Sequence, residues 1–259
     1  MFTRLWLWPN LLSLDAPLIA LLWQILFVRC FHSRPPAWSP VLLAVSVWLI
    51  YAADRALDAW RGSGDRPRHE FYRRHWRVIF PYWIVALCAC GWLAWRYLPA
   101  REFDCGALLL AGVAVYLVGV HAVPLTLSRA GSKEAAVAAL FGIGTVLAAW
   151  PQLSTASDVL SIALFAVLCW INCTSIEDWE DRRPARGGAY FAAAAIAVVA
   201  AVCLREHRPV LGSAETASAV GLIVLDRVRG RLSPDALRVL ADAALASPVL
   251  FLPWAGMRI

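Results

Sequence analysis

Residues 105–123, CGALLLAGVAVYLVGVHAV, form a long run without Asp, Glu, Lys or Arg. A helix needs about 20 mainly apolar residues to cross a hydrocarbon core of roughly 30 Å. Comparable blocks recur along the chain, in which 61% of the 259 residues are hydrophobic and only 16% are charged. Soluble domains rarely have this composition. The sequence therefore predicts an all-α, polytopic membrane protein.

Nine segments have the length and composition of membrane spans. In chain order they are Leu11–Phe31, Pro40–Trp60, Val78–Leu98, Cys105–Val123, Glu134–Trp150, Asp158–Asn172, Gly188–Leu204, Val210–Leu225 and Pro234–Pro253. The sixth is short, Asp15 lies in the first, and the last two contain Glu215, Asp235, Arg238 and Asp242. Eight spans are therefore an alternative to nine.

Basic residues are distributed unevenly between the two sides of this nine-span arrangement. Seventeen of the 24 Lys and Arg residues lie on the side of the N-terminus and of the loops after spans two, four, six and eight. Because basic residues favour the cytoplasmic side, we expect these loops in the cytoplasm and the chain in the cytoplasmic membrane. Attraction to anionic membrane lipids is expected from the same charges. Nothing in the pattern indicates a nucleic-acid partner.

Histidines and cysteines give no metal-ligand spacing. The seven cysteines lie within or beside spans and are interpreted as free thiols. His121 is interpreted as a hydrogen-bonded structural histidine, because no second intramembrane histidine accompanies it. The segment RHEFYRRH, residues 68–75, is predicted to be a solvated loop near the lipid head groups.

Acidic side chains mark two places in the chain. The second span ends in YAADRALDAW, residues 51–60, where Asp54 and Asp58 are four residues apart. If the helix continues this far, both carboxylates lie on one face of it. The sixth span is followed by NCTSIEDWEDRR, residues 172–183, which contains Glu177, Asp178 and Asp181. Each group alone also fits an ordinary solvated charge cluster with its neighbouring arginines.

The two acidic groups occupy equivalent places, because each comes after the second span of a four-span block. This indicates one transmembrane domain, residues 1–259, with two pseudo-repeats at about 11–123 and 134–225 and a ninth helix. A repeat of four spans is parallel, so both acidic groups are expected to face one central cavity on the cytoplasmic side.

Facing carboxylates favour a divalent cation between them. Mg²⁺ takes oxygen ligands and usually joins one or two protein carboxylates to substrate phosphates. Lys133, Arg73 and Arg182 are candidates for binding the remaining phosphate oxygens. An acidic metal site with a basic rim above an apolar cavity fits a diphosphate that carries a lipid tail.

At these segments the chain resembles the UbiA superfamily of intramembrane prenyltransferases. The resemblance covers most of the chain: nine spans, acidic motifs after helices two and six, and Lys133-Glu134 at the start of helix five. Asp54 and Asp58 match the last two acids of the family's N-D-x-x-D-x-x-x-D motif, and residues 177–181 are similar to its second motif. The chain departs from the first motif by having Ile50 and Tyr51 in place of Asn and Asp.

The resemblance implies transfer of a prenyl group from a polyprenyl diphosphate to a hydrophobic acceptor, usually aromatic. It implies that Mg²⁺ is held by Asp54, Asp58, Glu177, Asp178 and Asp181 and assists departure of the diphosphate. Lys133, Arg73 and Arg182 would stabilise the charge on the leaving group.

Two other functions remain open from the sequence. One is a non-catalytic lipid-binding or scaffold protein of the same fold, which the altered first motif favours. The other is a transporter, which also carries intramembrane acids at a repeat interface. A CDP-alcohol phosphotransferase is not favoured, because its glycine-containing acidic signature is absent from the sequence.

Overall fold

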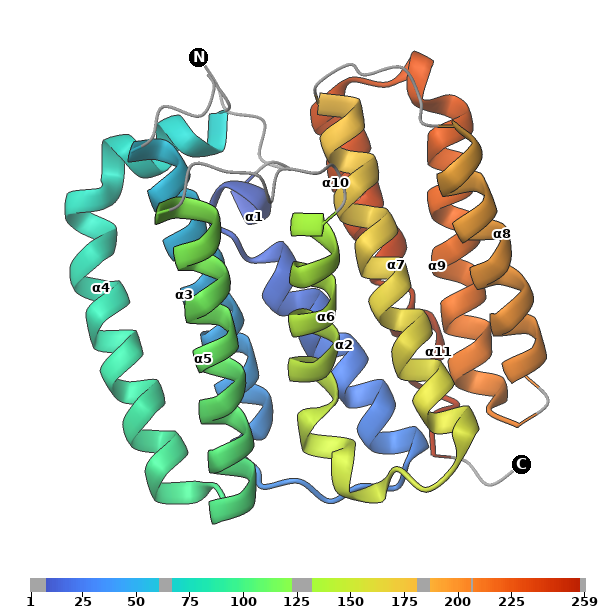
Figure 1. Ribbon diagram of the computed structural model, residues 1–259, viewed down its shortest axis with the longest axis horizontal. Coiled ribbons are helices and arrows are strands. Elements are labelled where there is room, and N and C mark those ends of the chain that lie inside the picture. Colours follow the sequence, from blue (N-terminus) through green and yellow to red (C-terminus); the bar gives the residue numbers. More distant parts are fainter. Residues whose placement is uncertain (1–7, 61–66, 123–131, 181–186, 206, 257–259) are drawn as a thin grey trace. The chain divides into compact units, whose positions relative to one another are not determined.

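The computed structural model describes residues 8–60, 67–122, 132–180, 187–205 and 207–256, and every regular element within these ranges is helical (Figure 1). In chain order the elements are α1 (Trp8–Leu11), α2 (Asp15–Cys30), α3 (Ser39–Trp60), α4 (Pro67–Tyr97), α5 (Ala100–Ala122), α6 (Ser132–Val146), the 3₁₀ helix η2 (Leu147–Gln152), α7 (Ala156–Glu180), α8 (Gly187–Leu204), α9 (Pro209–Val228), the 3₁₀ helix η3 (Arg229–Arg231), α10 (Pro234–Leu245) and α11 (Pro248–Phe251).

The chain divides into two compact units. Unit 1 comprises Met1–Leu21 and Pro36–Leu127, and unit 2 comprises Leu22–Pro35 and Ser128–Ile259. The division therefore falls within α2, between α2 and α3, and between α5 and α6. The two predicted four-helix pseudo-repeats would require the two halves of the chain to have similar helix arrangements. That similarity stays a prediction.

Unit 1 is organised around α3. One face of α3 presents Ala52, Ala56 and Ala59, which are buried with Tyr72 of α4. These residues lie three or four positions apart, so they share one side of the helix. Because alanine side chains are small, α4 packs closely along this side of α3. Helix α5 contacts α3 as well, and α1 contacts α4.

Unit 2 is organised around α7, which contacts α6, α8, α9 and α10. Aromatic side chains fill its interior. The Trp23 and Phe165 ring centroids lie 4.5 Å apart, and Phe27 packs edge-on against Phe165. The Trp23 indole donates a hydrogen bond to the Leu245 carbonyl. The second half of α2 is thereby fixed against α7 and α10.

Six helical segments among the described residues are long and apolar enough to cross a membrane, not nine. They are Ser39–Trp60, Glu70–Tyr97, Ala100–His121, Lys133–Gln152, Ala156–Glu180 and Pro209–Arg231. The membrane-spanning, helical character of the chain agrees with the prediction. In α8 the side chains are described from Ala194 onward, and Ala194–Leu204 is a shorter apolar helix.

The first and last predicted spans are interrupted in the structure. Ser13, between α1 and α2, has a φ of 58°, a left-handed conformation that ends a helix. The helix after this break, α2, has only 16 residues. The predicted span Pro234–Pro253 separates into α10 and α11 at Ala246 and Ser247. Ser247 donates its hydroxyl to the Ala214 carbonyl of α9, and Pro248 begins the next helix.

The predicted loop at residues 68–75 is wrong, because these residues belong to the first turns of α4. Arginine and glutamate are good helix formers, and Tyr72 is buried within this stretch. A buried tyrosine anchors the basic segment to α3. Similarly, α7 continues past the predicted end at Asn172 and reaches Glu180.

Candidate functional site: two acidic helix ends

The acidic pair of unit 1 lies on the last turns of a continuous helix. Because α3 extends to Trp60, Asp54 and Asp58 are stacked one turn apart, as the sequence predicts for an uninterrupted helix. Their side chains are 28% and 22% exposed. They are therefore neither buried in the apolar interior nor part of a solvated loop.

His121 of α5 meets this pair. Its Nε2 lies 3.0 Å from Asp54 Oδ1, a hydrogen bond in which the ring nitrogen donates, and its Nδ1 lies 3.9 Å from Asp58 Oδ1. The imidazole is only 7% exposed. The expectation of a hydrogen-bonded histidine is confirmed, and its hydrogen-bond partner is Asp54 of the first motif, with Asp58 nearby. Sequence reasoning did not connect them, because His121 is 67 residues from Asp54.

The two faces of α3 thus have different roles. Ala52, Ala56 and Ala59 face α4, whereas the aspartates lie on a different side of the helix. Arg73, a predicted phosphate ligand, lies on α4 next to the buried Tyr72, and its own side chain is exposed. Arg73 is thus available to solvent or head groups.

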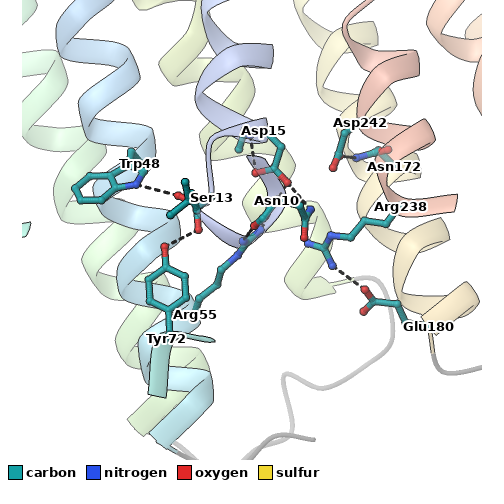
Figure 2. Close-up of polar contacts among 12 residues, drawn as sticks. Asn10, Ser13, Asp15, Trp48, Arg55, Tyr72, Asn172, Glu180, Arg238 and Asp242 are labelled. Carbon is teal, nitrogen blue, oxygen red and sulfur yellow. Dashed lines mark hydrogen bonds and ion pairs between the residues drawn. The ribbon is translucent and has the colours of Figure 1, made fainter. Parts of the chain in front are cut away.

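A second polar cluster in unit 1 surrounds the break between α1 and α2 (Figure 2). The Asn10 amide donates to Asp15 Oδ2 at 2.7 Å. The buried Arg55 side chain donates to the Asn10 carbonyl, and its Nη2 lies 3.7 Å from Asp15 Oδ2. This arrangement supplies a donor to the Asn10 carbonyl at the break and neutralises Asp15 with Arg55.

Two further side chains hold the same break. The buried Ser13 hydroxyl forms a 2.8 Å hydrogen bond with the Tyr72 hydroxyl. The Trp48 indole donates to the Leu12 carbonyl at 3.1 Å. The acid-containing end of α3 is therefore fixed both to α4 and to the α1–α2 segment. Two features of the sequence could have predicted this cluster: Asp15 lies in an otherwise apolar block, and Arg55 lies inside the first acidic motif.

The acidic group of unit 2 lies on the final turn of α7. Asp178 is buried, and its Oδ2 has no hydrogen-bond partner. Glu177 is half-buried. Glu180 accepts a 2.7 Å hydrogen bond from Arg238 of α10, so a cation from a helix distant in sequence binds beside the motif (Figure 2).

Other polar contacts tie this end of α7 to its neighbours. The Asn172 amide donates to Asp242 Oδ1 of α10 at 3.3 Å. The Trp179 indole donates to Asp226 Oδ1 of α9 at 3.3 Å. The three helices are thereby held together where the acidic motif ends. The role of α10 was not predicted from sequence, because its partners lie at least 58 residues away.

Not every predicted site residue is described. Asp181 and Arg182 lie outside the described residues, so their predicted roles stay predictions. Lys133 is half-buried in the first turn of α6, next to the buried Glu134. Glu134 lies in the first turn of α6, where an acidic side chain is favourable.

The carboxylates suit a hard cation in donor type but form no complete cage. Within the described part of the chain, no group of three or more His, Cys, Asp or Glu side chains is close enough to hold a metal ion. Mg²⁺ is commonly held by one or two carboxylates together with waters and substrate phosphates. The Asp54–Asp58 pair and the unpartnered Asp178 Oδ2 fit that mode of binding.

The chain was compared with protein-family models, with curated proteins and with solved structures. None of the three comparisons gives a match. The similarity to UbiA prenyltransferases therefore rests on the residues of the two acidic motifs and on their places along the chain.

Proposed function

We propose that this protein is an intramembrane prenyltransferase of the UbiA type. It would transfer the prenyl group of a polyprenyl diphosphate to a hydrophobic acceptor, usually an aromatic one. The observation that carries the proposal is the placement of both acidic motifs on the last turns of long apolar helices, α3 and α7. A charged group of a lipid substrate would meet the protein at this depth.

Divalent cations fit the acids that the proposal assigns. Asp54 and Asp58 in unit 1, and Glu177, Asp178 and Asp181 in unit 2, would hold Mg²⁺. When bound, Mg²⁺ supplies charge neutralisation of the diphosphate and so favours its departure. Asp178 supports this assignment best, because a buried carboxylate oxygen without a partner is costly unless a ligand satisfies it.

The chain's own residues would bind and orient the rest of the diphosphate. Lys133 would bind phosphate oxygens from the first turn of α6, and Arg73 and Arg182 would contribute in the same way. His121 would fix the orientation of Asp54 through their 3.0 Å hydrogen bond. The acceptor would enter from the bilayer, and the acidic motifs would face the cytoplasm, as the distribution of basic residues indicates.

Binding of a polyprenyl diphosphate to the purified protein tests the proposal without the acceptor. Affinity is measured with and without Mg²⁺ for the unaltered protein, for Asp54→Ala and for Asp178→Ala. Asp104→Ala is the matched control, because Asp104 is an exposed aspartate of α5 outside both motifs. We expect magnesium-dependent binding that each motif variant abolishes and the control retains.

Two results would contradict the proposal. Binding that is absent in all four proteins, or equal in all of them, contradicts the prenyltransferase proposal. Circular dichroism and gel filtration of each variant establish that it is folded. Loss of binding in both motif variants would mean that each acidic motif is needed to bind the diphosphate.

A non-catalytic lipid-binding or scaffold protein of the same fold is the second candidate. The observation that favours it is that protein side chains already contact the motif acids, Arg238 at Glu180 and His121 at Asp54. Such contacts satisfy acids without a metal. This candidate predicts that magnesium changes neither the stability of the protein nor its affinity for the polyprenyl diphosphate.

A further inference from the structure

A buried carboxyl group lies in unit 2 away from the acidic motif. Glu215 of α9 is 1% exposed, and neither of its carboxyl oxygens has a hydrogen-bond partner. It lies inside one of the six candidate spans, Pro209–Arg231. Acidic side chains at such depth are costly and commonly mark the path of a proton or an ion. Nothing in the proposed prenyl transfer uses this residue.

Ser161 of α7 is a polar side chain near Glu215. Ser161 is fully buried, and its hydroxyl has no hydrogen-bond partner. Two buried polar groups without hydrogen bonds therefore lie near each other on contacting helices. An ionised carboxylate without hydrogen bonds is strongly disfavoured in an apolar interior, so Glu215 carries a proton.

Two further polar side chains, Asp158 and Arg208, lie in the direction of the start of α7. Asp158 lies three residues before Ser161 on α7, so the two side chains are on the same side of the helix. Arg208 binds Asp158 Oδ1 through both Nε, at 2.8 Å, and Nη2, at 2.6 Å. The Arg208 side chain is 27% exposed. This pair therefore has a partly exposed member at the end of α7 opposite to Glu177 and Asp178.

The other elements packed on α9 supply few ionisable groups at this level. From α2, Cys30 lies close enough to Glu215 and Arg208 to be influenced by their charges. From α8, the Arg205 side chain lies against Gly212, one turn before Glu215. On α10, Arg238 and Asp242 bind residues at the other end of α7. None of these contacts supplies a permanent counter-ion to Glu215.

We propose that Glu215 is a proton-binding site that exchanges its proton with solvent through Ser161 and the Asp158–Arg208 pair. In each exchange the Glu215 O–H proton passes to the Ser161 oxygen while the Ser161 hydroxyl proton passes on to Asp158 and then to water. The reverse sequence restores the starting state, and no bond between heavy atoms changes. A metal cation is a poorer occupant, because it needs more oxygen ligands than this pair provides.

Infrared spectroscopy of the protein in lipid tests both parts of the proposal. The unaltered protein should show the C=O stretch of a protonated carboxylic acid at neutral pH, and Glu215→Gln should remove it. Asp178→Asn is the matched control and should retain the band assigned to Glu215. An unchanged spectrum in Glu215→Gln contradicts the protonated state.

The path is tested by transfer into D₂O, which shifts the C=O band as deuterium replaces the proton. Ser161→Ala should slow this shift by roughly tenfold or more, because the variant lacks the hydroxyl that relays the proton between Glu215 and Asp158. Ser161→Thr keeps a hydroxyl and should restore the rate. Equal rates in the unaltered protein and Ser161→Ala would overturn the path.

A measurement on the unaltered protein keeps the proposal testable if a variant fails to fold. Dicyclohexylcarbodiimide adds to protonated carboxyl groups in apolar surroundings, and the adduct is located by mass spectrometry. We expect labelling at Glu215 that persists at alkaline pH, where exposed carboxylates are ionised and unreactive. Labelling that spares Glu215 would overturn the proposal.

Discussion

The acidic groups of the two units, Asp54 with Asp58 in unit 1 and Asp178 with Glu180 in unit 2, differ in burial and in the side chain that binds them. The unit 1 pair is about a quarter exposed and lies beside an imidazole, whereas Asp178 is buried and Glu180, two residues further on, binds Arg238 with both side chains at most 15% exposed. A partly exposed pair can exchange partners at low cost, but removing one member of a nearly buried pair is expensive. The two acidic helix ends therefore give one adaptable group, Asp54 and Asp58, and one rigidly held group, Glu180 with Arg238.

Breaking the rigid group should have the largest effect. Arg238→Met removes the guanidinium that binds Glu180 at 2.7 Å, where both side chains are at most 15% exposed. The free energy of unfolding should fall by about 3 kcal/mol or more, because a nearly buried carboxylate loses its charged contact with Arg238. Unfolding in mixed detergent micelles measures the change.

A matched arginine in the same unit serves as the control. Arg229 pairs with Asp226 at 3.5 Å, and the two side chains are 33% and 26% exposed. Both are more exposed than the side chains of the Arg238–Glu180 pair. Arg229→Met should cost under about 1 kcal/mol. Equal losses in the two variants would remove the distinction between a rigid and an adaptable acidic group.

Ligand addition should have the next largest effect if the proposed function is right. Mg²⁺ with a polyprenyl diphosphate at a hundred times its dissociation constant should stabilise the folded protein by about 2.7 kcal/mol. Asp58→Asn should lose most of this gain, since the exposed pair supplies ligands and little packing. Thermal unfolding with and without both components measures the gain, and a full gain in Asp58→Asn would separate unit 1 from the substrate site.

The smallest effect is expected for the imidazole of unit 1. His121→Phe removes one charge-assisted hydrogen bond to Asp54, so the free energy of unfolding should fall by about 1.5 kcal/mol. His75→Phe is the control, because His75 is exposed on α4. A loss for His121→Phe as large as that for Arg238→Met would mean that the unit 1 group is as rigidly held as that of unit 2.

Sequence reasoning was most successful where one helix contains the whole signal. The uninterrupted apolar run that ends at His121 predicts α5, and the four-residue spacing of Asp54 and Asp58 predicts their shared face. It failed where a side chain from another helix decides the outcome. The helix is interrupted at Ser13, where Tyr72 and Trp48 form hydrogen bonds with Ser13 and Leu12. The hydropathy of residues near Ser13 cannot reveal these partners, because they lie on other helices.

The acidic sites show the same limit. The motifs identified Asp54, Asp58 and the acidic run that contains Asp178 and Glu180, but not their partners. His121 contacts Asp54 across 67 residues of sequence, and Arg238 contacts Glu180 across 58. Such long-range partners depend on packing, which periodicity within one segment does not determine. The protonated Glu215 was visible only as an acid in a weak span, because Ser161 lies on another helix.

The length of α4 bears on the kind of bilayer that suits this protein. Its 31 residues extend for about 46 Å at 1.5 Å per residue, against roughly 30 Å of hydrocarbon. The first turns, which contain Arg73, Arg74 and Arg77, therefore overhang the hydrocarbon into the head-group layer. A thicker or strongly anionic membrane would shorten the overhang or neutralise it. Hydrophobic mismatch that tilts or shifts α4 would thus also shift the end of α3 that contains Asp54 and Asp58, because the buried Tyr72 packs α4 against that end.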